Sequence, residues 1–245
     1  MVDGPMFDVG PAFAMPIAPA RIEAILGLLR PCRLLADVGT DHGFVPVLAV
    51  QRNLAERAIA SDLREAPIQL AQRHIARAAL TDRVDVVLGD GLLALENRRA
   101  DAVVIAGMGG ELIRSLCEAA PHVLLDVRQL VLQPNQNAEF VRLWARQNGW
   151  HLREETMLER RGRFFVVTSF ERGTAEDPAY AGITGWDEGV LLRVGPLLAR
   201  RKDPVALRFC EAQRARLDHL VKAGRAVYAP ELAGFRVACE RLRPG

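Results

Sequence analysis

The chain has 245 residues, of which half are hydrophobic and a quarter charged, and its 32 basic and 30 acidic side chains leave a formal net charge of +2. This ordinary globular composition excludes a disordered, collagenous or fibrous protein and allows one large domain, or one domain with an appendage. The small net charge by itself indicates no polyanionic partner.

The charge is unevenly distributed along the chain. Residues 1–185 carry 20 basic and 23 acidic side chains, whereas residues 186–245 carry 12 basic and 7 acidic ones. Although the whole chain is close to neutral, its C-terminal quarter is therefore basic. All basic residues except Lys202 and Lys222 are arginines, in both parts alike, so the placement of the charge is informative and the choice of arginine is not.

The cysteines indicate neither a disulfide framework nor a zinc site, because the four are far apart and form no CxxC pair. We therefore expect reduced thiols in a cytoplasmic protein without a metal. Residues 1–20, interrupted by prolines and lacking a basic region, are expected to form a flexible extension rather than a signal peptide. No apolar run approaches the roughly 20 residues that span a membrane.

The predicted elements begin with a helix from residue 21 that ends at Pro31. Short continuous apolar runs then alternate with amphipathic stretches, which is typical of parallel strands buried between two helical layers. The predicted strands span residues 33–37, 58–62, 84–88, 102–106 and 129–133, and the predicted helices span 44–51, 65–79, 111–119 and 138–148.

The pattern changes after Gly149. Residues 151–158 and 164–170 are longer β-like runs around a charged turn, and they predict an antiparallel pair at the edge of the sheet. Five parallel strands followed by such a pair is the class I methyltransferase layout, although other doubly wound folds share this periodicity. Residues 173–189 predict a linker, and residues 190–245 a helical appendage whose apolar spacing is that of a coiled coil.

The first predicted strand ends in Asp37-Val38-Gly39-Thr40-Asp41-His42-Gly43. Ligands of doubly wound sheets bind at the carboxyl ends of strands, and Gly39 allows a nucleotide to approach the backbone. Asp41 would repel a pyrophosphate, and GxGxxG is missing, which disfavours a nicotinamide dinucleotide. The loop suits a sulfonium ligand such as S-adenosylmethionine, or it is only a tight turn with a helix-capping Asp.

Acidic residues also follow the next two strands. Asp62 could accept both hydroxyls of a ribose, or it could cap the next helix. Asp90, between two glycines, could accept from an adenine amino group, or it could lie in a simple turn. Because three such strand ends succeed one another, we predict an adenosine-type ligand across the first three strands.

The fourth and fifth strand ends carry glycines and amides. Gly107-Met108-Gly109-Gly110 would let the backbone pass close to a transferred group, or it is a flexible loop before a helix. The amides of Gln133-Pro134-Asn135 could match the donor and acceptor on one edge of adenine, or they form a turn and a helix cap.

Taken in order, DVGTDHGFVP, AIASD, GDG, IAGMGGELI and LVLQPN closely resemble the TrmK family, the bacterial tRNA adenine-22 N1-methyltransferases. The resemblance covers roughly residues 21–172 motif by motif, and the C-terminal part in layout. It implies a Rossmann-like catalytic domain over residues 21–172, a helical tRNA-binding appendage, S-adenosylmethionine as methyl donor and tRNA as substrate.

The resemblance also implies roles for individual residues. Asp41, Gln133 and Asn135 are the candidate catalytic residues, the last two beside the acceptor base. The candidate cofactor residues are Asp37, Gly39, Asp41 and His42 at the methionine end, Asp62 at the ribose, Asp90 and Gly91 at the adenine, and Gly107 and Met108 near the transferred methyl. Phe44 and Phe165 stand where relatives often have Tyr, so any contact of those hydroxyls is absent here.

The reaction needs little acid–base chemistry, because N1 of adenine carries a free lone pair at neutral pH and the protein has mainly to align it. Asp41 or Asn135 could stabilise the positive charge that develops on the base. His42 could move a proton later, or it only positions the loop.

The basic C-terminal segment predicts a phosphate-binding surface, or alternatively solvated helix faces with intrahelical ion pairs. The candidate cations are Arg200, Arg201, Lys202, Arg208, Arg214, Arg216, Lys222 and Arg225. Rival functions are a methyltransferase for another RNA base or a small molecule, and a non-catalytic tRNA-binding module. We expect a monomer that contacts tRNA but neither a membrane nor a metal.

Overall fold

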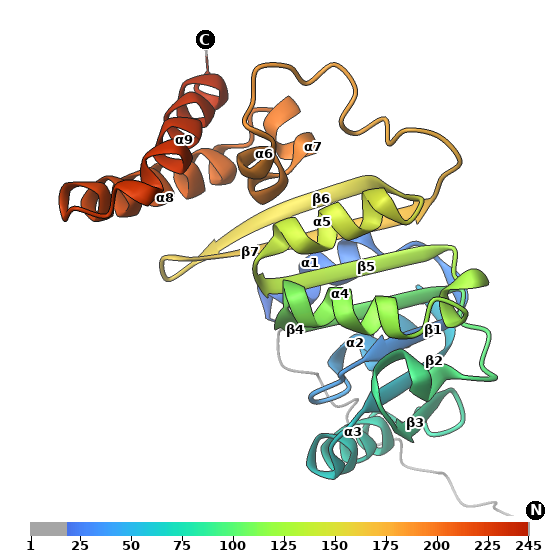
Figure 1. The fold of residues 1–245 in the computed structure, drawn as a ribbon. Coiled ribbons are helices and arrows are strands. Elements are labelled where there is room, and N and C mark those ends of the chain that lie inside the picture. Colours follow the sequence, from blue (N-terminus) through green and yellow to red (C-terminus); the bar gives the residue numbers. More distant parts are fainter. Residues whose placement is uncertain (1–18, 245) are drawn as a thin grey trace, which may run out of the picture.

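The computed structural model describes residues 19–244, so most of the predicted N-terminal extension lies outside the described residues (Figure 1). Its centre is a seven-stranded sheet of order β3-β2-β1-β4-β5-β7-β6. The strands are β1 Cys32–Val38, β2 Ala55–Asp62, β3 Val84–Leu88, β4 Ala102–Gly109, β5 Gln129–Gln136, β6 Trp150–Arg160 and β7 Arg163–Arg172. The first five are parallel, and β7 pairs antiparallel with both β5 and β6. The predicted parallel sheet with an antiparallel pair at its edge is confirmed.

Helices cover both faces of this sheet. They are α1 Ala20–Leu28, α2 Phe44–Gln51, α3 Glu65–Arg77, α4 Gly110–Ala119 and α5 Ala138–Gln147, with the short 3₁₀ helices η1 Gly91–Leu95 and η2 Val123–Leu125. Successive residues of β4 alternate between the two apolar cores: Val103 packs with α4 and α5, and Val104 packs with α1, α2 and α3. Because both faces are covered, the strands are apolar at nearly every position.

The strands β4 and β5 extend further than predicted, through the glycine and amide segments that we expected to be loops. Met108 pairs with Pro134, and Gly109 with Gln136, after register shifts that follow Ala106 and Met108. Gly107 lies there with a φ of +80°, a left-handed conformation that favours glycine. The irregularity lets the ladder continue although the backbone bends, so these residues are held by strand pairing.

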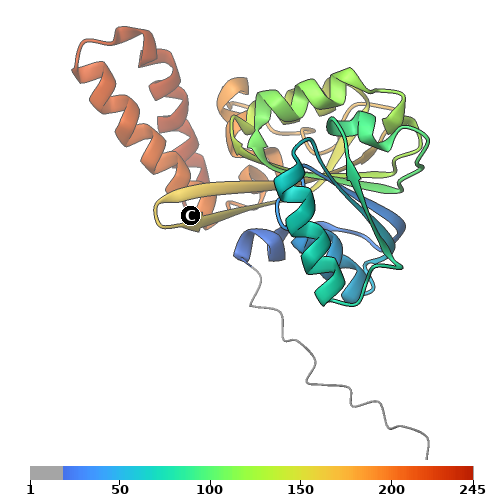
Figure 2. The same ribbon diagram turned by 90° about the horizontal axis from the view of Figure 1, so that it is seen from below.

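The C-terminal part is helical, with α6 Glu188–Val194, α7 Pro196–Arg200, α8 Pro204–Lys222, the 3₁₀ helix η3 Ala226–Tyr228 and α9 Ala229–Leu242. Figure 2 shows α8 and α9 as an antiparallel hairpin that projects away from the sheet. Its core, around Cys210, Leu217 and Phe235, also contains Met157 and Val166 from the β6–β7 ribbon. The ribbon therefore belongs to the sheet at one end and packs against the helical hairpin at the other.

Membrane spans and metal clusters are both missing from residues 19–244. No helix there is long and apolar enough to cross a membrane. The same residues contain no group of three or more His, Cys, Asp or Glu side chains placed to hold a metal ion.

Candidate active site

The carboxyl ends of the central strands meet at one edge of the sheet. The strand order reverses at β1, which lies between β2 and β4, and ligands of such sheets bind outside this switch point. The backbone N–H groups of Gly39 and Thr40 both donate to the carbonyl oxygen of Ser61 at 2.8 Å. The backbone N–H of Gly89 donates to the carbonyl oxygen of Asp62 at 3.0 Å. The ends of β1, β2 and β3 are thus fastened side by side.

A cavity of about 290 Å³ opens at the end of β1. It is lined by the loop from Gly39 to Val45, by Asp37 beneath it, by Ala106 of β4 and by Arg21 of α1. Asp37 is only 5% exposed, and burial raises the pKa of its carboxyl to about 6. A buried carboxylate beside an open cavity is stabilised by a positively charged ligand, as a sulfonium or an ammonium group would be.

Gly39 and Met108 come from different strand ends and lie against each other. Gly39 has a φ of +76°, and a Cβ atom there would overlap the methyl carbon of Met108. A side chain at position 39 would therefore be strained and would have to displace Met108. The backbone at this point stays bare, which is what close approach of a ligand requires.

The loop after Gly39 is held by polar and aromatic contacts. Asp41 and His42 lie 3.0 Å apart, Oδ2 to Nε2, and both side chains are partly exposed. The carbonyl oxygen of His42 is 2.8 Å from Nδ1 of His74 on α3, and the Phe44 ring packs against both imidazoles. The loop is thus tied to α3, while the Asp41 carboxylate stays 69% exposed at the cavity.

Asp62 is buried, and one of its carboxylate oxygens is engaged. Its Oδ1 accepts from the backbone N–H of Arg64 at 2.9 Å, and Arg64 itself is the N-cap residue of α3. The alternative that Asp62 caps this helix is therefore wrong, because the helix begins too late. Among the described residues no donor bonds to Oδ2, so this oxygen can accept from a ligand.

The end of β3 is more open. Asp90 is exposed, and its side chain forms no hydrogen bond within residues 19–244. Beside these acidic residues, Leu63 is 65% exposed and Leu93 is 44% exposed. Large apolar side chains left in solvent around a polar group are typical of a binding surface for a flat, partly apolar ligand.

The amides at the end of β5 hold the bend in β4. Gln133 is fully buried; its Oε1 accepts from the Gly107 N–H at 3.2 Å, and its Nε2 donates to the carbonyl oxygen of Pro134 at 2.9 Å. Asn135 is exposed, and its Nδ2 donates to the carbonyl oxygen of Gly107 at 2.6 Å. Neither amide caps α5, whose N-cap residue is Asn137, so that alternative is wrong too.

A second cavity, of about 860 Å³, lies between Asn135, the tip of the β6–β7 ribbon and α8. Phe164 and Phe165 line it, together with Arg163, Gln213 and Arg216. The Oε1 atom of Gln213 is buried without a hydrogen-bond partner among the described residues. The cavity therefore combines cations, aromatic rings and an unused amide, which are the groups that bind nucleotides.

Arg21 lines both cavities, and sequence reasoning missed it. Its guanidinium lies 3.5 Å from where a Cβ atom of Gly107 would stand. No carboxylate of the described part of the chain is within ion-pair distance of it. Nothing in the sequence marks this residue, because a basic side chain early in an amphipathic helix is ordinary.

The predicted cations of the C-terminal segment divide into two groups. Five are engaged within the protein: Arg200 with the carbonyl oxygens of residues 178, 179 and 181, Arg201 with the Asp203 carboxylate and the Glu155 carbonyl oxygen, Lys202 with the Arg243 carbonyl oxygen, Arg208 with the Glu159 carboxylate, and Lys222 with the Asp218 carboxylate. Arg214, Arg216 and Arg225 form no ion pair within residues 19–244. The alternative of intrahelical ion pairs therefore holds for Lys222, which pairs with Asp218 on α8, whereas the other four cations are engaged outside their own helices.

The tip of the β6–β7 ribbon adds cations that the sequence had suggested only as turn residues. Arg160, Arg161 and Arg163 are exposed and form no ion pair with the described residues. Arg163 shares the larger cavity with Arg216 of α8. The unpaired basic surface is thus built by the sheet and by the helical hairpin together.

Comparisons with known proteins agree with this arrangement. Residues 35–229 match the family model described as TrmK: tRNA (adenine(22)-N(1))-methyltransferase. The chain is 36% identical to the tRNA (adenine(22)-N(1))-methyltransferase of Bacillus subtilis over 188 residues, which cover 77% of each chain.

Two solved structures extend the likeness to nearly the whole fold. The m1A22 tRNA methyltransferase TrmK of Bacillus subtilis superposes with a TM-score of 0.79 at 30% identity, covering 91% of this chain and 95% of that one. A Streptococcus pneumoniae protein in complex with S-adenosyl-L-methionine superposes with a TM-score of 0.81 at 27% identity, covering 91% and 100%. Since the family model spans most of the chain as well, this protein belongs to the TrmK family of tRNA (adenine(22)-N(1))-methyltransferases.

Proposed function

We propose that this family member holds S-adenosylmethionine across the carboxyl ends of β1, β2 and β3 and methylates N1 of adenine 22 of tRNA beside Asn135. One observation carries the proposal. The cavity at the end of β1 and the basic, aromatic cavity behind Asn135 share Arg21, so a cofactor site and a nucleotide site adjoin at the Gly107 bend.

The residues around the smaller cavity fit the cofactor, whose sulfonium supplies an electrophilic methyl group when bound. Asp37 and Asp41 provide negative charge near the sulfonium and ammonium groups, and Gly39 and His42 bring backbone to the methionine end. Arg21 pairs with the carboxylate of the methionine. The free Oδ2 of Asp62 accepts from the ribose hydroxyls.

The adenine ring of the cofactor lies at the end of β3 in this proposal. Asp90 accepts from its amino group, and Gly91 leaves room for the ring. The exposed leucines at positions 63 and 93 support this assignment because they would cover its faces.

The acceptor side depends on Asn135. Its Oδ1 stabilises the positive charge that develops on the adenine as N1 takes up the methyl group, and Asp41 adds a carboxylate at longer range. The fully buried Gln133 cannot present its amide to a base. We assign it to holding Gly107 in place, and Gly107 and Met108 would line the space around the transferred methyl group.

The tRNA itself is bound by both parts of the chain. Residues 21–172 form the catalytic domain, residues 173–189 connect it, and residues 190–245 supply cations from α8. Because position 22 lies in the folded core of tRNA, the base has to be loosened or flipped to reach Asn135. The aromatic and basic groups of the larger cavity support the binding of a flipped base there. We also expect the enzyme to act as a monomer in the cytoplasm.

The deciding experiment is methylation of unmodified tRNA transcripts by the full chain, with the modified base mapped. We expect N1-methyladenosine at position 22 only, and no product from a transcript with guanine at that position. Methylation elsewhere, or of a small molecule instead, contradicts the proposal. If S-adenosylmethionine binds in a calorimetric titration but no RNA is methylated, the chain is a binding module.

A further inference from the structure

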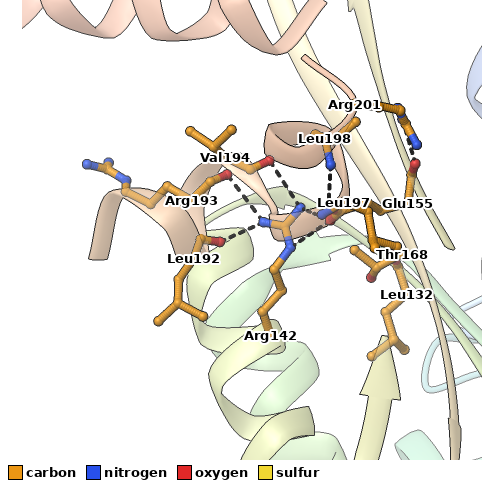
Figure 3. Close-up of polar contacts among 10 residues, drawn as sticks. All are labelled: Leu132, Arg142, Glu155, Thr168, Leu192, Arg193, Val194, Leu197, Leu198 and Arg201. Carbon is orange, nitrogen blue, oxygen red and sulfur yellow. Dashed lines mark hydrogen bonds and ion pairs between the residues drawn. The ribbon is translucent and has the colours of Figure 1, made fainter. Parts of the chain in front are cut away.

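An ion pair that the reaction does not use lies between the catalytic sheet and the helical unit. Arg142 on α5 and Glu155 on β6 have completely buried side chains, and their Nη2 and Oε2 atoms lie 2.6 Å apart (Figure 3). Nε of Arg142 also donates to Oε2 of Glu155, at 3.0 Å. Burying two charges costs free energy unless their remaining hydrogen-bonding groups are satisfied as well.

Arg142 directs its other donors to the end of α6. Its Nη1 donates to the carbonyl oxygens of Leu192 and Arg193 at 2.6 and 3.2 Å, and its Nη2 to that of Val194 at 3.4 Å. All five N–H groups of the guanidinium therefore have an oxygen partner. The carbonyl oxygens at the end of a helix have no N–H donors within the helix, and Arg142 supplies these donors for α6.

Glu155 does the same for the start of α7. Its Oε1 accepts from the backbone N–H groups of Leu197 and Leu198 at 2.8 and 3.1 Å. Between the helices, Gly195 has a φ of +111°, and a Cβ atom there would overlap the carboxylate of Glu155. The corner between α6 and α7 is therefore fitted around the ion pair, as Figure 3 shows.

This corner lies directly before α8 in the chain. Arg201, directly after α7, donates to the carbonyl oxygen of Glu155 at 2.8 Å, and α8 begins at Pro204. Two residues of α8, Gln213 and Arg216, line the same cavity as Asn135. The direction in which α8 leaves the corner thus decides how far these two residues lie from Asn135.

We propose that Arg142 and Glu155 are positioning residues that set the direction of α8 relative to Asn135 and thereby align tRNA. The proposal rests on the proposed function, since it concerns how that substrate is held. Neither residue touches tRNA, because both are buried. They act through α8, and their loss weakens the binding of tRNA and leaves the cofactor site unchanged.

The experiment compares Arg142→Lys with Arg146→Lys in the full chain. Both arginines are on α5 and contact α6, but Arg146 forms an exposed pair with Glu188 at 2.5 Å. A lysine at position 142 keeps the charge that Glu155 needs but has too few donors for the three α6 carbonyls. For each variant, the Kd for S-adenosylmethionine is measured by calorimetry, and kcat and KM for a tRNA transcript by methyl transfer.

We expect Arg142→Lys to raise the KM for tRNA roughly tenfold, with little change in kcat or in the Kd for S-adenosylmethionine. Arg146→Lys should change none of the three. A wild-type KM in Arg142→Lys, measured well below its melting temperature, overturns the proposal and leaves the pair a stabilising contact only. A fall in kcat at unchanged KM overturns it as well.

A milder variant covers the case in which Arg142→Lys does not fold. Arg201→Met removes only the bond from the residue after α7 to the Glu155 carbonyl oxygen and the pair with Asp203, from a partly exposed side chain. It should raise the KM for tRNA by a smaller factor, and an unchanged value overturns the proposal. Absence of tRNA methylation by the unaltered protein would instead contradict the proposed function, so the two failures are distinguishable.

Discussion

Asn135 donates its side-chain amide to the carbonyl oxygen of Gly107 at 2.6 Å, although 28 residues separate them in the chain. The bond joins the end of β5 to the bend in β4, at the place where the two cavities meet. The oxygen of the same amide accepts from Nε2 of Gln133 at 3.3 Å, so both ends of the exposed amide are fixed in direction. Such preorganisation is what stabilises charge in a transition state.

Asn135→Ala should therefore lower kcat by about 100-fold or more, because it removes both the oxygen and the bond that fixes Gly107. The Kd for S-adenosylmethionine should change much less. The measurement is methyl transfer to a tRNA transcript at saturating cofactor. Gln69→Ala, which removes an exposed amide on α3, is the control and should keep the wild-type kcat; equal rates for the two variants would exclude this role for Asn135.

Asp62→Asn tests the ribose contact separately from RNA. The substitution replaces an acceptor oxygen by a donor beside the ribose hydroxyls, so the Kd for S-adenosylmethionine should rise about tenfold or more. Calorimetry without tRNA measures this directly. Asp82→Asn, at an exposed acidic residue that pairs with no cation of residues 19–244, should have no effect, and an unchanged Kd in Asp62→Asn contradicts the assignment.

The buried Asp37 should make stability depend on pH. Burial raises the pKa of its carboxyl to about 6, so the folded state holds this proton more tightly than the unfolded state does. The free energy of unfolding should therefore fall as the pH rises from about 4 through about 6, by roughly 3 kcal/mol for a shift of about two units.

Asp37→Asn isolates this contribution because the amide has no proton to lose. The free energy of unfolding of the variant, relative to that of the wild type, should rise between about pH 4 and about pH 7, because only the wild type loses stability over this range. Denaturant titrations at both pH values measure it. A difference that stays constant across this range would show that Asp37 does not titrate there.

The arginines of the larger cavity should contribute to binding tRNA phosphates. Arg163→Ala and Arg216→Ala should each weaken tRNA binding and reduce the slope of log Kd against log salt by about 1, because each removes one phosphate contact. The control is Arg236→Ala, since this arginine already pairs with Asp218 on α8. An unchanged salt slope in both variants would show that tRNA phosphates bind at another surface.

Much of the fold follows from local pattern. Continuous apolar runs such as Ala102–Ala106 identify strands buried on both faces, and the short connections between elements bring the carboxyl ends of parallel strands to one edge. For that reason the amino-acid sequence alone predicts that Gly39, Asp62 and Asp90, each at or just beyond the end of its strand, are neighbours. Their order along the chain also carries the family resemblance.

The function of a polar residue within this frame was harder to predict. Gln133 was a candidate for contact with the base, but the bend in β4 encloses its side chain, and its amide binds Gly107 instead. Asp62 has the spacing of a helix cap, yet Arg64 takes the N-cap position of α3. Both outcomes depend on hydrogen bonds to backbone groups whose positions only the folded chain defines.

The amino-acid sequence by itself determined the order of the strands' polar ends, the class of ligand and the existence of a basic helical segment, because these depend on periodicity and on residue type. The tertiary structure decided which of those groups are free to act. Arg21, Gln213 and the Arg142–Glu155 pair are ordinary in the sequence; only packing between distant elements buries a guanidinium, leaves an amide unpartnered or places one arginine between two cavities.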